Sequence, residues 1–119
     1  MATIAVDFDG VIHKYSRGWQ DGSIYDDPVD GAIEGIWDLQ KTHAVYVHTT
    51  RSPDAVARWL ASHGVACTTD LQELEEFWNN RKIVLVSQRK LPAIAYIDDR
   101  AFLFKSWDDV LANFGVTDG

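Results

Sequence analysis

Two carboxylates, Asp7 and Asp9, stand two positions apart directly after a short apolar run, Ile4-Ala5-Val6, and Gly10 follows them. A run of this length with β-branched residues predicts a buried strand that ends at the acids. Because side chains alternate along a strand, Asp7 and Asp9 start on one side of the chain. Two close carboxylates repel unless a cation lies between them or one keeps its proton. The pair therefore predicts a Mg²⁺ site or an acid/base group, with an ordinary Asp-Gly turn as the structural alternative.

Two further apolar runs, 44–48 and 93–97, also end in polar residues. The first is followed by Thr49-Thr50-Arg51 and the second by Asp98-Asp99-Arg100. The carboxyl ends of parallel strands meet at one edge of a sheet, where ligands bind in open α/β folds. Lys90 precedes the second run, and its long side chain can reach the same crevice from a loop. These residues together predict one site.

The elements that must position this site alternate between strand and helix patterns. Helices are expected over residues 28–42, 53–63, 70–78 and 107–114, and further short strands over 65–68 and 83–86. Such alternation predicts βαβ units. The expected fold is therefore α/β: a Rossmann-like, doubly wound, mostly parallel sheet in three α/β/α layers, forming one domain over residues 1–119.

The helix expected over 28–42 depends on a start signal and an apolar stripe. Asp27 is a typical N-cap, and Pro28 would occupy the first helical position. Apolar residues then recur at helical spacing, with Ile33, Ile36 and Trp37 expected to face the core.

Residues 11–27 keep no strand or helix period. Aromatic residues such as Tyr15, Trp19 and Tyr25 alternate there with glycines and polar residues. Loops of this length in a compact domain are usually functional. We expect a flap-like loop near the site that either contacts a substrate or covers core surface.

Composition limits the partners. The chain has 119 residues and a net charge of −7, which argues against broad non-specific binding to nucleic acid or to an anionic membrane. No apolar run reaches the roughly 20 residues that span a bilayer. The single cysteine, Cys67, suits a reducing compartment, so a cytoplasmic location is expected. The sequence leaves the oligomeric state open, and an oligomer is compatible with it.

The chain resembles the haloacid dehalogenase-like (HAD) superfamily of phosphohydrolases over nearly its full length. The stretch Asp7-Phe8-Asp9-Gly10-Val11-Ile12 fits that family's first motif, Asp-x-Asp-Gly followed by small apolar residues. Thr49 is similar to the second-motif hydroxyl, Lys90 to the third-motif lysine, and Asp98-Asp99 to the fourth-motif acids. The order along the chain also matches.

The resemblance implies a Mg²⁺-dependent phosphomonoester hydrolase. In it, Asp7 would attack phosphorus to form an aspartyl-phosphate, and Asp9 would act as general acid and then base. Thr49 and Lys90 would hold phosphoryl oxygens. Thr50, one position on, is an alternative hydroxyl, and Gly10 is a further substrate-binding candidate. Metal ligands would be Asp7, Asp9, and Asp98 or Asp99, and the adjacent acid pair leaves open which of the last two contacts the metal.

The intervals between motifs are too short for a cap domain, so the chain is similar to short, capless bacterial and phage HAD-like proteins. An open site suits small phosphorylated molecules or exposed phosphates of macromolecules. Nucleotides and nucleic-acid ends are the first substrates to test. A phospho-acceptor receiver domain would use similar residues in a different chain order. The remaining alternative is a non-catalytic or weakly active module that binds a phosphorylated ligand or a protein.

Overall fold

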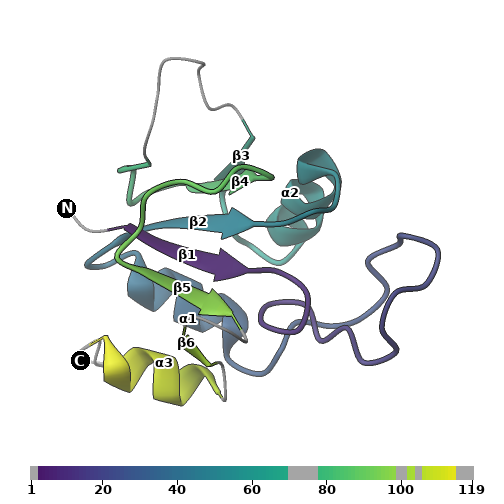
Figure 1. Cartoon of the computed structure of the whole chain (residues 1–119), viewed down its shortest axis with the longest axis horizontal. Coiled ribbons are helices and arrows are strands. Elements are labelled where there is room, and N and C mark those ends of the chain that lie inside the picture. The colour runs from purple at the N-terminus through teal and green to yellow at the C-terminus, as the bar shows by residue number, and fades with distance from the viewer. Residues whose placement is uncertain (1–2, 70–77, 99–101, 104–105, 115–119) are drawn as a thin grey trace.

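The computed structural model describes residues 3–69, 78–98, 102–103 and 106–114 of the protein (Figure 1). Within these ranges, strands and helices alternate along much of the chain, which confirms the expected α/β class. In chain order the elements are β1 (Thr3–Asp7), α1 (Ala32–Leu39), β2 (Ala44–His48), α2 (Pro53–Ser62), β3 (Cys67–Thr68), β4 (Val84–Ser87), β5 (Ala95–Asp98), β6 (Phe102–Leu103) and α3 (Trp107–Asn113).

The strands form one sheet in the order β3-β4-β2-β1-β5-β6, and every pair is parallel. β1 is the first strand in the chain, yet it lies in the interior of the sheet. Its residue Val6 pairs with Val47 of β2 on one side and Ile97 of β5 on the other. The carboxyl ends of β1, β2 and β5 therefore lie along the same edge of the sheet.

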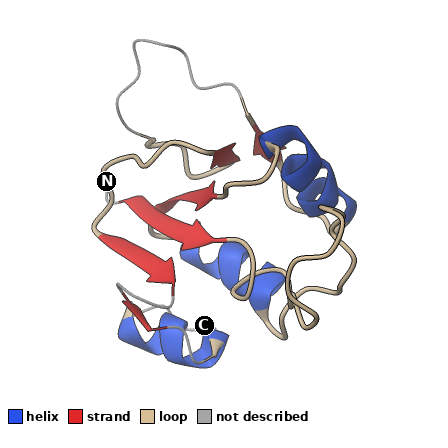
Figure 2. Ribbon diagram, turned by 45° about the vertical axis from the view of Figure 1, so that its right-hand side comes forward, coloured by secondary structure: helices blue, strands red, loops and turns tan. Residues whose placement is uncertain are grey.

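The two faces of the sheet are covered differently. Alternate strand residues such as Ile4 and Val6 belong to a buried cluster that includes Ile36 of α1, Leu60 of α2 and Val110 of α3. All three helices that the structure describes thus contribute to the core on one face, with α1 behind the strands in Figure 2.

On the opposite face, Ala5 and Tyr46 pack in a second buried cluster with Trp78 and Leu91. The helix expected over 70–78 falls almost entirely outside the described ranges, so the third layer of the expected α/β/α arrangement stays a prediction.

The helix expected to start at Pro28 begins only at Ala32. The backbone N–H of Val29 donates to the carbonyl of Ile12 at 2.7 Å, and Pro28 forms a bridge with His13. Residues 28–29 are therefore paired with the 11–27 loop instead of coiling, and the expected cap at Asp27 is wrong. Gly31, at φ 80°, supplies the left-handed turn that admits the helix.

Trp37 was expected to face the core, but it is 45% exposed. Its ring lies over Gly64, where a Cβ atom would come within 3.3 Å of the indole. The buried stripe of α1 is formed instead by residues including Ile33, Ile36 and Leu39. The apolar face of this helix is narrower than its sequence indicates.

The other expected elements agree more closely. α2 starts at Pro53 as predicted, and Ser106 caps α3 by accepting a hydrogen bond from the N–H of Asp109 at 3.1 Å. The strand expected over 83–86 lies one residue later, and the two-residue strand β6 was not predicted. None of the helices in the described part of the chain has the length and apolar character needed to cross a membrane.

Candidate active site

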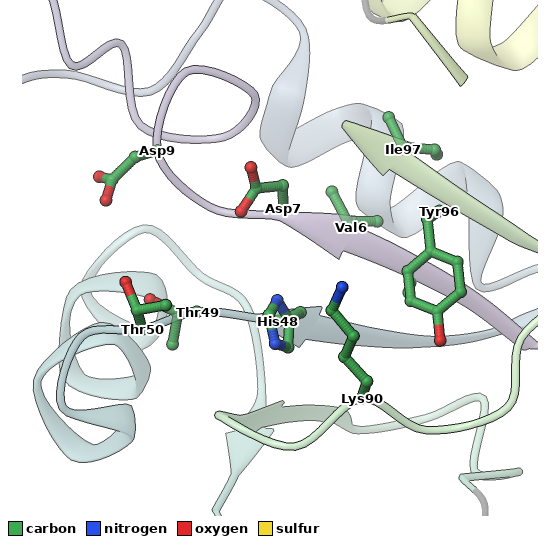
Figure 3. A pocket seen from close by; sticks show the side chains of 10 residues that line it. Val6, Asp7, Asp9, His48, Thr49, Thr50, Lys90, Tyr96 and Ile97 are labelled. Atoms are coloured by element: carbon green, nitrogen blue, oxygen red, sulfur yellow. The ribbon is translucent and has the colours of Figure 1, made fainter. Parts of the chain in front are cut away.

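A cavity of about 250 Å³ opens where β1 and β2 end, beside β5 (Figure 3). Five of the residues predicted from the sequence line it together, namely Asp7, Asp9, Thr49, Thr50 and Lys90. β1 lies between β2, which follows it in the chain, and β5, which comes much later. Cavities at such a reversal of strand order are the usual ligand sites of open parallel sheets.

A tight turn after β1 separates the two acids. Asp7 is half-buried, and its Oδ1 accepts a hydrogen bond from the N–H of Phe8 at 2.9 Å. The Phe8 carbonyl accepts from the N–H groups of Ile12 and His13, which folds the chain back on itself. Gly10 occupies this turn with φ 85°, a conformation that favours glycine. It is not among the described residues that line the cavity.

The two threonines after β2 differ in exposure. Thr49 is 3% exposed, and its Oγ1 accepts a hydrogen bond from the N–H of Arg51 at 3.0 Å. Its own hydroxyl proton remains a donor that can be directed to another group. Thr50 is exposed. Both line the cavity, so both remain candidates for a phosphoryl oxygen.

Lys90 reaches the cavity from the loop after β4, with its amino group directed toward β1 (Figure 3). The next residue, Leu91, is held by two tyrosines. The buried Tyr46 hydroxyl accepts from the Leu91 N–H at 2.8 Å and donates to the Leu91 carbonyl, which also accepts from Tyr96 at 2.6 Å. Burial raises the pKa of Tyr46, and the hydrogen bond with Tyr96 raises it further. The hydroxyl therefore stays protonated as a permanent part of this support.

Asp9 has two partners that sequence reasoning did not assign to it. Arg51 Nε lies 3.1 Å and 2.9 Å from the two carboxylate oxygens, and His13 Nδ1 lies 2.9 Å from Oδ1. Arg51 is 6% exposed and His13 is fully buried. The signal available in the sequence was weak: an arginine directly after a strand end and a histidine four residues after Asp9.

The 11–27 loop is part core and part projection. Val11, Ile12 and His13 are buried, while the remainder extends beyond the sheet edge (Figure 1). In the projecting part, the Tyr25 hydroxyl accepts from the N–H of Arg17 and donates to the carbonyl of Gly18. The loop therefore has an internal framework and lies next to Asp9 through His13.

The acid pair Asp98-Asp99 is only partly described by the structure. Asp98 ends β5, and because Val6 pairs with Ile97, Asp7 and Asp98 leave adjacent strands at the same level. The side chain of Asp98 and all of Asp99 lie outside the described part of the chain. That part contains no group of three or more metal-ligating side chains. The carboxylates of Asp7 and Asp9 that line the cavity are nevertheless oxygen donors of the kind that Mg²⁺ prefers.

Comparisons with models of protein families, with curated proteins and with solved structures found no match to this chain.

Proposed function

We propose that the protein is a Mg²⁺-dependent phosphomonoester hydrolase that acts through an aspartyl-phosphate on Asp7. The observation that carries this proposal is the cavity at the strand ends, which gathers Asp7, Asp9, a threonine and Lys90. These residue types supply a nucleophile, an acid/base and phosphate-binding donors. Their resemblance in type and order to the HAD motifs supports the same reaction.

In the first step, a carboxylate oxygen of Asp7 attacks phosphorus, and the bond from phosphorus to the leaving oxygen breaks. The protonated Asp9 carboxyl gives its proton to that oxygen, so the product leaves as an alcohol. In the second step, water attacks phosphorus, Asp9 takes the water proton, and the bond to Asp7 breaks. Inorganic phosphate is released, and both acids return to their starting states.

The phosphoryl oxygens would be held by Lys90 and by the hydroxyl of Thr49 or Thr50. Lys90 supplies the one ammonium group in the cavity lining that the structure describes, and it faces two carboxylates there. A phosphate dianion adds further negative charge, which one lysine does not balance. Asp7, the carbonyl of Asp9, and Asp98 or Asp99 would hold Mg²⁺, which when bound supplies the missing positive charge.

The loop indicates a substrate class. Tyr25 is engaged through its hydroxyl and lies under the Arg17 guanidinium at 4.4 Å, whereas Trp19 is 63% exposed. Trp19 also has a guanidinium, that of Arg51, 5.0 Å from its ring, but it is the most exposed of the three aromatic residues in this loop, and its exposed surface is available to stack on a base. Nucleotides and phosphorylated nucleic-acid ends are therefore the substrates to try first.

The test is a phosphate-release assay over nucleotides, sugar phosphates and end-phosphorylated oligonucleotides. We expect release that requires Mg²⁺, stops with EDTA and is abolished in Asp7→Asn. The matched control is Asp108→Asn, which removes an exposed carboxylate in the first turn of α3 and should leave the rate unchanged.

Release that persists in Asp7→Asn would overturn the mechanism. Mg²⁺ and phosphate binding without release from any substrate would favour the alternative of a phospho-ligand-binding module. Isothermal titration of the wild-type protein with Mg²⁺ and inorganic phosphate supplies that measurement.

A further inference from the structure

We propose that Arg51 and His13 are positioning residues that fix the Asp9 carboxylate for proton transfer. The projecting part of the 11–27 loop holds both side chains in place. This inference rests on the proposed function. It goes beyond it by assigning a role to two buried residues that lie outside the motif set. Neither lines the cavity of about 250 Å³, so neither is placed to touch a substrate there.

The carboxylate of Asp9 is held on one side only. Its side chain is 24% exposed, and it lines the cavity. On the protein side, Arg51 bonds both oxygens through one nitrogen, while His13 bonds Oδ1. Three hydrogen bonds from two directions fix the plane of the carboxylate. The lone pairs that remain are those available to a ligand in the cavity.

The loop determines the tautomer of His13. Its Nε2 lies 3.0 Å from the backbone N–H of Asp26, which can only donate. Nε2 must therefore accept, which places the ring proton of a neutral imidazole on Nδ1, facing Asp9. The ring is packed among aromatic side chains including Phe8 and Trp59, so it cannot turn without displacing them. His13 is thus a fixed donor to Asp9.

The loop also holds the far end of Arg51. Its Nη1 donates to the carbonyl of Gly22 at 2.7 Å, and the guanidinium carbon lies 5.0 Å from the Trp19 ring and 5.7 Å from the Tyr15 ring. Such cation–π contacts restrain the plane of the guanidinium. Nη2 is buried with no hydrogen-bond partner among the described residues. A buried donor without a hydrogen-bond partner lowers the stability of the fold. The presence of an arginine here is therefore better explained by a role at Asp9 than by a contribution to stability.

The chemistry of the first step uses this arrangement. As Asp9 gives its proton to the leaving oxygen, it acquires a negative charge, and the buried Arg51 guanidinium already faces that charge. Stabilisation that is in place before the reaction costs no rearrangement during it. An alkoxide leaving group depends strongly on this proton, whereas a nitrophenolate departs readily without it. The contribution of Arg51 should therefore depend on the leaving group.

The experiment compares kcat/KM for glycerol phosphate and for p-nitrophenyl phosphate in wild type, Asp9→Asn and Arg51→Gln. The value of kcat/KM reports the first step of the reaction for each ester. We expect Arg51→Gln to follow Asp9→Asn, with a fall of about 10-fold or more on glycerol phosphate and less than about 3-fold on p-nitrophenyl phosphate. The matched control is Arg58→Gln on the exposed side of α2, which should change neither value.

A role confined to folding would lower both values equally. Equal losses, or no loss, therefore overturn the inference. Asp7-dependent activity of the wild type would in that case still support the proposed function. Absence of any Asp7-dependent release in the wild type overturns both. If Arg51→Gln does not fold, Arg51→Met is measured in the same way. It keeps the length of the side chain and removes its charge, so the same two outcomes decide.

Discussion

The hydroxyl of Tyr46 and the backbone of Leu91 exchange two hydrogen bonds in the interior of the protein, one residue from Lys90. Tyr46→Phe removes this hydroxyl and leaves the buried N–H of Leu91 without its partner. We expect the free energy of unfolding to fall by about 1–3 kcal/mol. Urea denaturation followed by fluorescence measures this change.

Tyr96→Phe is the comparison for this variant. The Leu91 carbonyl would then keep Tyr46 as a donor, and the N–H would keep its acceptor. The loss of stability should therefore be smaller than for Tyr46→Phe. Equal losses in the two variants would contradict the account of the buried N–H.

The carboxyl group of Asp26 makes the stability of the folded protein depend on pH. Hydrogen bonds from the side chain and backbone of Ser16 lower the pKa of Asp26 from 3.8 to about 2. A carboxyl group whose pKa is lower in the folded state stabilises that state above its ordinary pKa. The stabilisation is lost as pH falls toward the lower value. The relevant window is therefore pH 4 to pH 2.

We expect the melting temperature of the wild type to fall through this window more steeply than that of Asp26→Asn. The asparagine variant should be less stable near pH 6 and should approach the wild type near pH 2. Calorimetry across this range provides the comparison. Parallel curves for the two proteins would mean that Ser16 and Asp26 do not interact in solution.

Residue types and spacing were sufficient to predict that Asp7, Asp9, Thr49 and Thr50 share the cavity, because they follow strands that end at one edge. Gly10, also predicted, does not line it, and the prediction for Asp98 and Asp99 falls outside the described side chains. Residue types and spacing were not sufficient to predict what surrounds each side chain. Arg51 lies 42 positions from Asp9, and the two meet only because β1 and β2 are neighbours in register. Such a pair leaves no local pattern in the sequence.

Among the elements, α1 and α3 meet at a close approach. A Cβ atom at Gly35 of α1 would lie 2.3 Å from the Trp107 ring of α3. In a helix, alanine is more favourable than glycine by about 1 kcal/mol. Overpacking of a core, however, costs about 1–3 kcal/mol or more. We expect Gly35→Ala to lower the free energy of unfolding, as measured by urea denaturation.

A second substitution tests the cause. Trp107→Leu makes room beside Gly35, although it is destabilising by itself because it removes a buried ring. Added to Gly35→Ala, it should cost less than it does in the wild type, since part of the clash is already relieved. Strictly additive effects would show that the two helices do not meet at this point.

The strands other than β6 could be predicted because buried parallel strands are short, continuous apolar runs that need no partner to be recognised. The start of α1 could not, because the N–H of Val29 donates to the carbonyl of Ile12 and the carbonyl of Asp27 accepts from the N–H of Lys14, so this segment pairs with the loop instead of coiling. Local start signals at Asp27 and Pro28 were outweighed by this long-range pairing. The exposed position of Trp37 has a similar origin, in its contact with Gly64 after α2.

At the scale of the whole molecule, the net charge of −7 governs encounters with polyanions. Binding to duplex DNA of arbitrary sequence requires several clustered cations that release counterions. We expect no saturable binding of a labelled duplex at physiological salt below about 10⁻⁴ M, measured by fluorescence anisotropy. Micromolar binding would contradict this expectation.

The interior position of β1 also has a consequence for biosynthesis. β1 is made first, but its two neighbours come from residues 44–48 and 95–98. Before β5 has been translated, β1 can pair with β2 and bring Asp7 and Thr49 together, yet the side of β1 that β5 covers stays open. Contacts between parts so distant in sequence form slowly and late. The candidate site is therefore completed only after β5 has emerged from the ribosome, and a nascent chain stalled before that point carries Asp7 and Asp9 without the pocket.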